Sequence, residues 1–136
     1  MRAIYGLLNS DEPTEVEVTN ADELANLAVT VRDSCVLSEI PAIEIEDGSG
    51  SSLVFAQTER GVAILIVDDD HSYHSLAVDT VNRSDSSVTA FTYLGEYSEI
   101  PVKYTLSQEW AQQVVRAYFS GGMSAALQCA EWEADW

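Results

Sequence analysis

The chain has 136 residues, of which 46% are hydrophobic, so it is long enough for one folded domain and is not a disordered acidic tail. Twenty-three Asp and Glu residues stand against six Lys and Arg, giving a formal net charge of −17, which disfavours nucleic acid or an anionic membrane as a direct partner and favours a basic one. An acidic or halophilic protein without such a partner is the alternative. With no transmembrane run and no secretion signal, the sequence predicts a single cytoplasmic domain over residues 1–136.

The first part of the chain predicts a hairpin followed by a helix. Residues 2–8 and 14–19 have the character of strands, and the turn residues NSDEP separate them. Asn20, with Glu23 three residues later, is typical of a capping box. Apolar residues then recur at helical spacing, so a helix is predicted over residues 21–33.

The middle of the chain predicts consecutive strands. The segments IPAIEIED and SSLVFAQ flank the turn DGSG, which indicates a strand–turn–strand unit. The apolar run VAILIV, residues 62–67, suits a central strand covered on both faces, and helices are the expected cover. Two further strands, over residues 73–80 and 88–94, complete an antiparallel meander.

The last part predicts a second helix and a short final strand or docked tail. Ser107 can cap the helix, and Gly121 and Gly122 are expected to end it. The tail LQCAEWEADW follows. The expected fold class is therefore α+β, a mostly antiparallel β-sheet (meander) with two amphipathic helices packed on one face.

The cysteines and tryptophans are expected to be structural. Cys35 and Cys129 have none of the spacings typical of zinc or redox sites, so both are predicted to be buried free thiols. Trp110 and Trp132 are expected to pack on the core. No cofactor and no metal are predicted.

The stretch VDDDHSYH, residues 67–74, carries the densest cluster of polar side chains. In a strand His71 and His74 would point to opposite sides, and the acidic residues lack the spacing of a calcium loop, which disfavours a metal site. No nucleophile motif occurs in the chain, so an enzyme is not expected. A charged hairpin end remains, either inert or offered to a cationic partner. An acidic metal-binding or enzymatic domain using residues 68–74 is kept as the alternative.

The stretch YLGEYSEIP is predicted to be a loop after a strand, with Pro101 at its exit. An aromatic side chain among carboxylates is common in protein interfaces, although an ordinary connection between strands is equally compatible with the pattern. The candidate partner-binding residues from both stretches are Asp68, Asp69, Asp70, Glu96, Tyr97 and Glu99.

The order of features resembles a known family. The segment VTAFTYLGEYSEIPVKY, the helix SQEWAQQVVRAYFSGG and the closing Trp132-Glu133 are similar to the first-numbered immunity-protein family of bacterial polymorphic toxin systems. The matching positions are Gly95, Glu99, Pro101, Trp132 and Glu133, and they can serve the fold without touching a partner. The resemblance covers most of the chain and is strongest over residues 88–133.

This resemblance implies a non-enzymatic antitoxin that binds and neutralises a cognate secreted bacterial toxin. The partner it implies is a basic toxin domain that acts on nucleic acid, with a cytidine deaminase first and a nuclease second. A domain of charge −17 could occlude the basic substrate cleft of such a toxin. A general acidic DNA-mimic interaction module is the other alternative.

Overall fold

The computed structural model is an α+β fold, as the sequence predicts. It describes residues 1–6, 12–36, 39–46, 48, 50–67, 74–78 and 87–135. In this part of the chain, two α-helices accompany one eight-stranded sheet and one two-stranded sheet, and every pairing between named strands is antiparallel. None of the described helices has the length and apolar character needed to cross a membrane.

The large sheet has the strand order β10-β6-β5-β4-β3-β1-β2, and β9 pairs with the start of β5. The opening hairpin is confirmed, because β1 pairs with β2 along its whole length. The central pair is β4 and β5, whose apolar sequences form the middle of the core. The strand bounds are β1 Arg2–Tyr5, β2 Thr14–Glu17, β3 Ile43–Glu46, β4 Ser52–Thr58, β5 Gly61–Val67, β6 His74–Val78, β9 Thr105–Leu106 and β10 Glu131–Asp135.

Helix α1, Ala21–Asp33, has the predicted bounds and start. The side chain of Asn20 accepts a hydrogen bond from the backbone N–H of Glu23 at 2.9 Å. The carboxylate of Glu23 in turn accepts from the N–H of Thr19 at 2.8 Å. These bonds satisfy donors that a helix start would otherwise leave unpaired.

Helix α2, Gln108–Leu127, is longer than predicted. Ser107 caps it as expected, accepting from the N–H of Trp110 at 3.1 Å. The glycine pair was expected to end the helix, but only Gly122 leaves helical geometry, with φ 76° and ψ −165°. The predicted end therefore holds for the first helical segment of α2, and a second segment that reaches Leu127 was not predicted. Gly122 adopts a backbone conformation that is readily accessible only to glycine, and the residues SAAL resume the helix after the kink.

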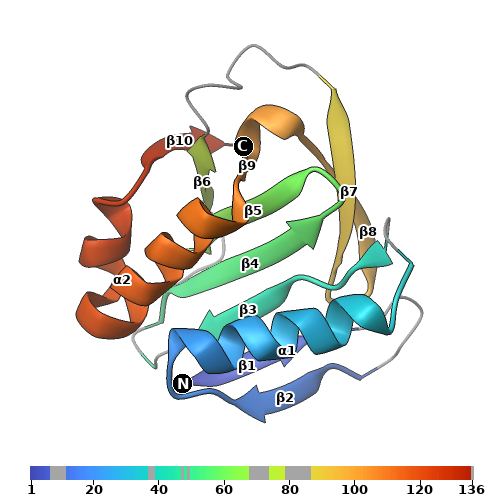
Figure 1. Cartoon of the computed structure of the whole chain (residues 1–136), viewed down its shortest axis with the longest axis horizontal. Coiled ribbons are helices and arrows are strands. Elements are labelled where there is room, and N and C mark those ends of the chain that lie inside the picture. The colour runs from blue at the N-terminus through green and yellow to red at the C-terminus, as the bar shows by residue number, and fades with distance from the viewer. Residues whose placement is uncertain are drawn as a thin grey trace.

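The sheet is covered on both faces, but by different elements. Both helices pack on one face, as predicted, over the core side chains Leu53, Phe55, Val62 and Ile64. The opposite face carries Val54, Ala56, Ala63, Leu65 and Val67. Helices were the expected cover there too. That expectation is wrong, because a β-hairpin of β7, Val88–Tyr93, and β8, Glu96–Pro101, supplies Phe91 and Ile100 to this second core. In Figure 1 the hairpin runs steeply across the direction of β4 and β5.

The tryptophans pack as predicted, and the cysteines do so only in part. Trp110 and Trp132 are partly buried against the core, and the indole N–H of Trp110 donates to the carbonyl of Cys129 at 2.8 Å. The predicted final strand is β10, which pairs with β6. Cys35 and Cys129 are free thiols, but each is partly exposed and not buried. Both lie near helix ends, where solvent reaches the chain.

Candidate protein-binding surface

The predicted loop around Glu96, Tyr97 and Glu99 is a strand. These three residues lie in β8, which pairs with β7 in a register that joins Tyr93 to Glu96 and Val88 to Pro101. The connection is a two-residue turn in which Leu94 has φ 48° and Gly95 has φ 89°. Positive φ at both central residues gives the turn the twist that a tight hairpin requires. The loop interpretation is therefore wrong for residues 96–101.

Backbone hydrogen bonds anchor the hairpin to the large sheet. Thr92 donates its N–H to the carbonyl of Ile40 at 3.0 Å and accepts from the N–H of Ala42 at 2.6 Å. The turn rests on the backbone of Gly6, where an added Cβ would lie only 3.1 Å from Leu94. The hairpin is thus held at its side and at its tip.

A buried polar contact fixes the hairpin further. The hydroxyl of Tyr93 donates a hydrogen bond to Oε2 of Glu44. Glu44 is only 6% exposed. Burial, followed by the hydrogen bond and the charge of Glu44, raises the pKa of Tyr93 above its ordinary value of 10. The phenol therefore stays protonated and continues to donate to the carboxylate.

The outer side of the hairpin carries exposed apolar and acidic groups together. Paired residues of an antiparallel hairpin share a face, so Tyr97 and Glu99 lie on the same side as Ala90 and Val88. We call these four residues the hairpin face. Six large hydrophobic residues are exposed in the described part of the chain, and Val88, Leu94 and Tyr97 of this hairpin are three of them. Such clustering marks an interaction surface more than scattered exposed residues do.

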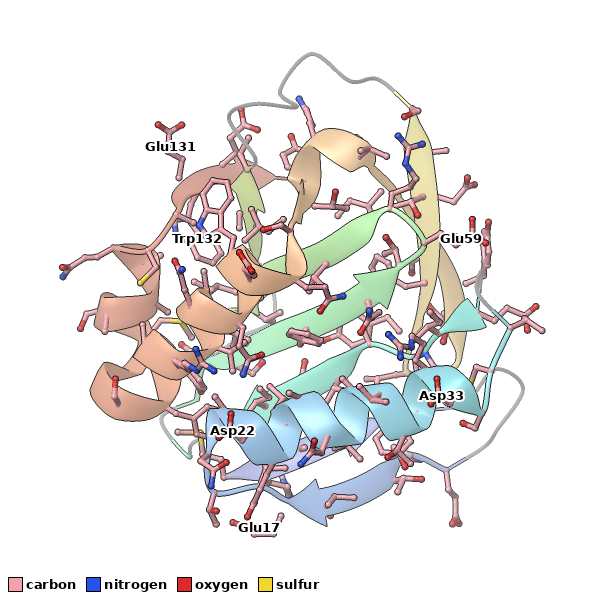
Figure 2. All side chains as sticks on the ribbon, viewed as in Figure 1. Glu17, Asp22, Asp33, Glu59, Glu131 and Trp132 are labelled. Atoms are coloured by element: carbon pink, nitrogen blue, oxygen red, sulfur yellow. The ribbon has the colours of Figure 1, made fainter. Side chains whose placement is uncertain are left out.

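A shallow cleft of about 220 Å³ joins the hairpin face to the turn between β4 and β5. The turn contributes Glu59 and Arg60, and Glu59 projects beside the hairpin in Figure 2. Among the residues that the structure describes, Glu59, Glu96 and Glu99 have no ion-pair partner and no side-chain hydrogen bond. These carboxylates therefore keep their full acceptor capacity for another molecule.

Acidic side chains near the β1–β2 edge have cations beside them. Arg2 contacts both Glu46 and Glu15, and its hydrogen bond and ion pair with Glu46 raise the pKa of the guanidinium. The amino group of Met1 contacts Glu17 at 2.9 Å. The unpaired carboxylates around the hairpin face thus differ from those at the β1–β2 edge.

The structure brings together two of the six predicted partner-binding residues. Tyr97 and Glu99 share the hairpin face, whereas Glu96 points to the opposite side of β8, at the exposed end of the hairpin. Asp68, Asp69 and Asp70 lie outside the described residues, as does His71. Among the residues that are described, no group of three or more His, Cys, Asp or Glu side chains is arranged to hold a metal ion.

Sequence reasoning missed Glu59, Arg60 and Val88 as parts of this surface. The sequence predicts no candidate site residue between SSLVFAQ and VAILIV, where Glu59 and Arg60 lie, and it predicts Val88 only as the start of a strand. The signal that could have found Val88 is strand alternation, because the hairpin register places Val88 on the same face as Glu99 and opposite the buried Phe91.

Comparisons with known proteins return nothing similar: no protein-family model, no curated protein and no solved structure matches this chain.

Proposed function

We propose that this chain is an immunity protein that binds a basic toxin domain and neutralises it by covering its substrate cleft. The observation that carries the proposal is the hairpin face, where an exposed tyrosine stands among carboxylates that have no ion-pair partner in the described part of the chain. The proposed partner is a nucleic-acid-targeting toxin, with a cytidine deaminase first and a nuclease second. The protein acts in the cytoplasm and performs no chemistry of its own.

Tyr97 supplies the anchor of the proposed interface. Tyr97 is 54% exposed, and its flat ring offers a large contact area at low cost in side-chain entropy. Truncating an interface tyrosine of this kind to alanine often weakens the binding free energy by about 2 kcal/mol or more, which is about thirtyfold in affinity. The β-strand backbone holds the ring in place before binding, which limits the entropy lost on association.

The carboxylates supply attraction and discrimination. A toxin cleft that binds phosphates is rich in Lys and Arg, and a domain with net charge −17 is drawn to it over long range. Glu59 and Glu99 lie at the cleft beside Tyr97 and can receive two of those cations. Blocking of this kind needs no catalytic residue in the inhibitor.

Co-expression with the product of the adjacent reading frame, as the candidate toxin, tests the proposal. Cells carrying the toxin should survive with the wild-type chain, and the two proteins should co-purify. Glu99→Lys combined with Tyr97→Ala should abolish both effects, because it removes the anchor and reverses one rim charge. Asp22→Lys is the charge-matched control, since Asp22 is 83% exposed at the start of α1, far from Glu59 in Figure 2.

Two results would count against the proposal. Survival that does not depend on the wild-type chain removes the immunity function altogether. Equal protection by the double variant and by Asp22→Lys, with both proteins folded, removes the hairpin face as the contact surface.

A further inference from the structure

A second and larger depression lies on the helix side of the turn between β4 and β5. It is a groove of about 840 Å³ between the end of α1 and the start of α2. Glu59 and Arg60 border both this groove and the hairpin cleft. The groove is lined by Arg32, Ile40, Gln57, Thr58, Glu59, Arg60, Gly61, Ser107 and Gln108.

The floor of the groove contains a polar side chain without a partner. Gln57 is only 7% exposed, and its side-chain amide makes no hydrogen bond within the residues described above. The amide is nevertheless not enclosed in the core, since its polar atoms retain contact with the molecular surface. It therefore opens into the groove. Its two N–H donors and one acceptor are therefore available to a molecule that enters the groove.

Positive charge also gathers here, against the trend of the chain. Of the five Lys and Arg residues in the described part, Arg32 and Arg60 both line the groove. Arg32 has one long contact, from Nε to Asp33 at 3.4 Å, and its terminal N–H groups have no partner among the described residues. A guanidinium with free terminal N–H groups matches the two oxygens of a carboxylate.

We propose that this groove binds a small organic carboxylate that also carries an amide, of the class of acylated amino acids. Arg32 receives the carboxylate, and Gln57 pairs with the amide, for which it has both a donor and an acceptor. A monoanion is favoured over phosphate because the field of a −17 chain and the nearby Glu59 oppose a second negative charge. The volume suits a molecule larger than a carboxylate alone. This site is independent of the proposed immunity function.

Titration of the isotope-labelled protein with N-acetylglycine tests the proposal by NMR. The side-chain amide signals of Gln57 should shift and saturate, while sodium chloride at the same ionic strength should leave them in place. Acetamide, which lacks the carboxylate, and inorganic phosphate should each bind at least tenfold more weakly. A short peptide with a free C-terminus, compared with its amidated form, distinguishes a peptide end from a free metabolite as the source of the carboxylate.

Variants separate the site from a general effect of salt. Arg32→Gln, on a side chain 37% exposed, should fold normally and weaken binding at least tenfold. Arg116→Gln, which removes a charge outside the groove, should bind like the wild type. Equal shifts with sodium chloride, or unchanged affinity in Arg32→Gln, would overturn the proposal.

Discussion

The hydrogen bond between Tyr93 and Glu44 predicts how much stability the fold loses when the hydroxyl of Tyr93 is removed. In Tyr93→Phe the ring still fills its place beside the second core, but the carboxylate of Glu44 loses its hydrogen-bond donor. Glu44 is 6% exposed, so water replaces that donor poorly. The substitution should therefore destabilise the fold by more than a surface hydroxyl would.

The expected magnitude follows from the charge of the acceptor. A hydrogen bond to a charged group contributes about 1.5–3 kcal/mol to stability. Unfolding entropy of about 2.1 cal/mol/K per residue, over 136 residues, converts each kcal/mol into a change of about 3.5 °C in the midpoint. Thermal unfolding followed by circular dichroism should thus show a midpoint about 5–10 °C lower in Tyr93→Phe.

Tyr97→Phe is the matched control for this measurement. Tyr97 is 54% exposed and its hydroxyl makes no bond in the part of the chain that the structure describes, so its removal should change the midpoint by less than about 1 °C. In a double-mutant cycle, Tyr93→Phe should lower the midpoint much less in the Glu44→Gln background than in the wild type. Equal midpoints for Tyr93→Phe and wild type would refute the argument.

The same contact predicts a dependence on alkaline pH. The pKa of Tyr93 is raised in the folded state above its ordinary value of 10, mainly by burial. Its contribution to stability is therefore complete below pH 10 and is lost as the pH rises toward the folded-state pKa. The free energy of unfolding should fall above pH 10 more steeply in wild type than in Tyr93→Phe. Parallel curves for the two proteins would contradict this cause of the shift.

The remaining stability predictions concern the backbone. Asn20→Ala should cost about 1 kcal/mol in urea unfolding, because the N–H of Glu23 loses its cap; no change would mean that the cap is unimportant. Gly61→Ala should cost about 1–3 kcal/mol, since φ is 148° and the new Cβ would lie 2.8 Å from the carbonyl oxygen of Leu106. Gly48→Ala, with φ 87° and open space around it, should cost less, and the reverse order would contradict the steric argument.

The helices could be predicted from the sequence because their signals are local. Asn20, Glu23 and Ser107 define helix starts by contacts within three or four residues, and the structure confirms each one. The end of α2 was harder to predict. Whether Gly122 ends a helix or only interrupts it depends on packing beyond it, where Ala126 is fully buried.

The hairpin could not be predicted because its turn has an unusual first residue. Tight hairpin turns usually have Asn, Asp or Gly where φ is positive, whereas this turn has Leu94 before Gly95. The segment that follows was therefore interpreted as a loop. Its position over the sheet depends on distant contacts, from Thr92 to Ile40 and Ala42 and from Tyr93 to Glu44, which no local pattern reveals.

Only part of the candidate surface could be predicted, because its geometry also depends on distant contacts. The composition of YLGEYSEIP made Tyr97 and Glu99 candidates for an interface but did not predict how they are arranged. Their place beside Glu59 and Val88 follows only from the hairpin register and from its contact with the β4–β5 turn.

The salt dependence of the affinity for the co-purified partner tests the central claim most directly. Raising sodium chloride from about 50 to 200 mM should weaken wild-type binding at least tenfold, as measured by isothermal titration calorimetry. The reason is that salt screens the attraction between carboxylates and cations in the interface. Glu99→Lys should bind more weakly and respond less to salt than Asp22→Lys does. An affinity that does not change with salt, or the same curve for both variants, would contradict binding through the acidic hairpin face.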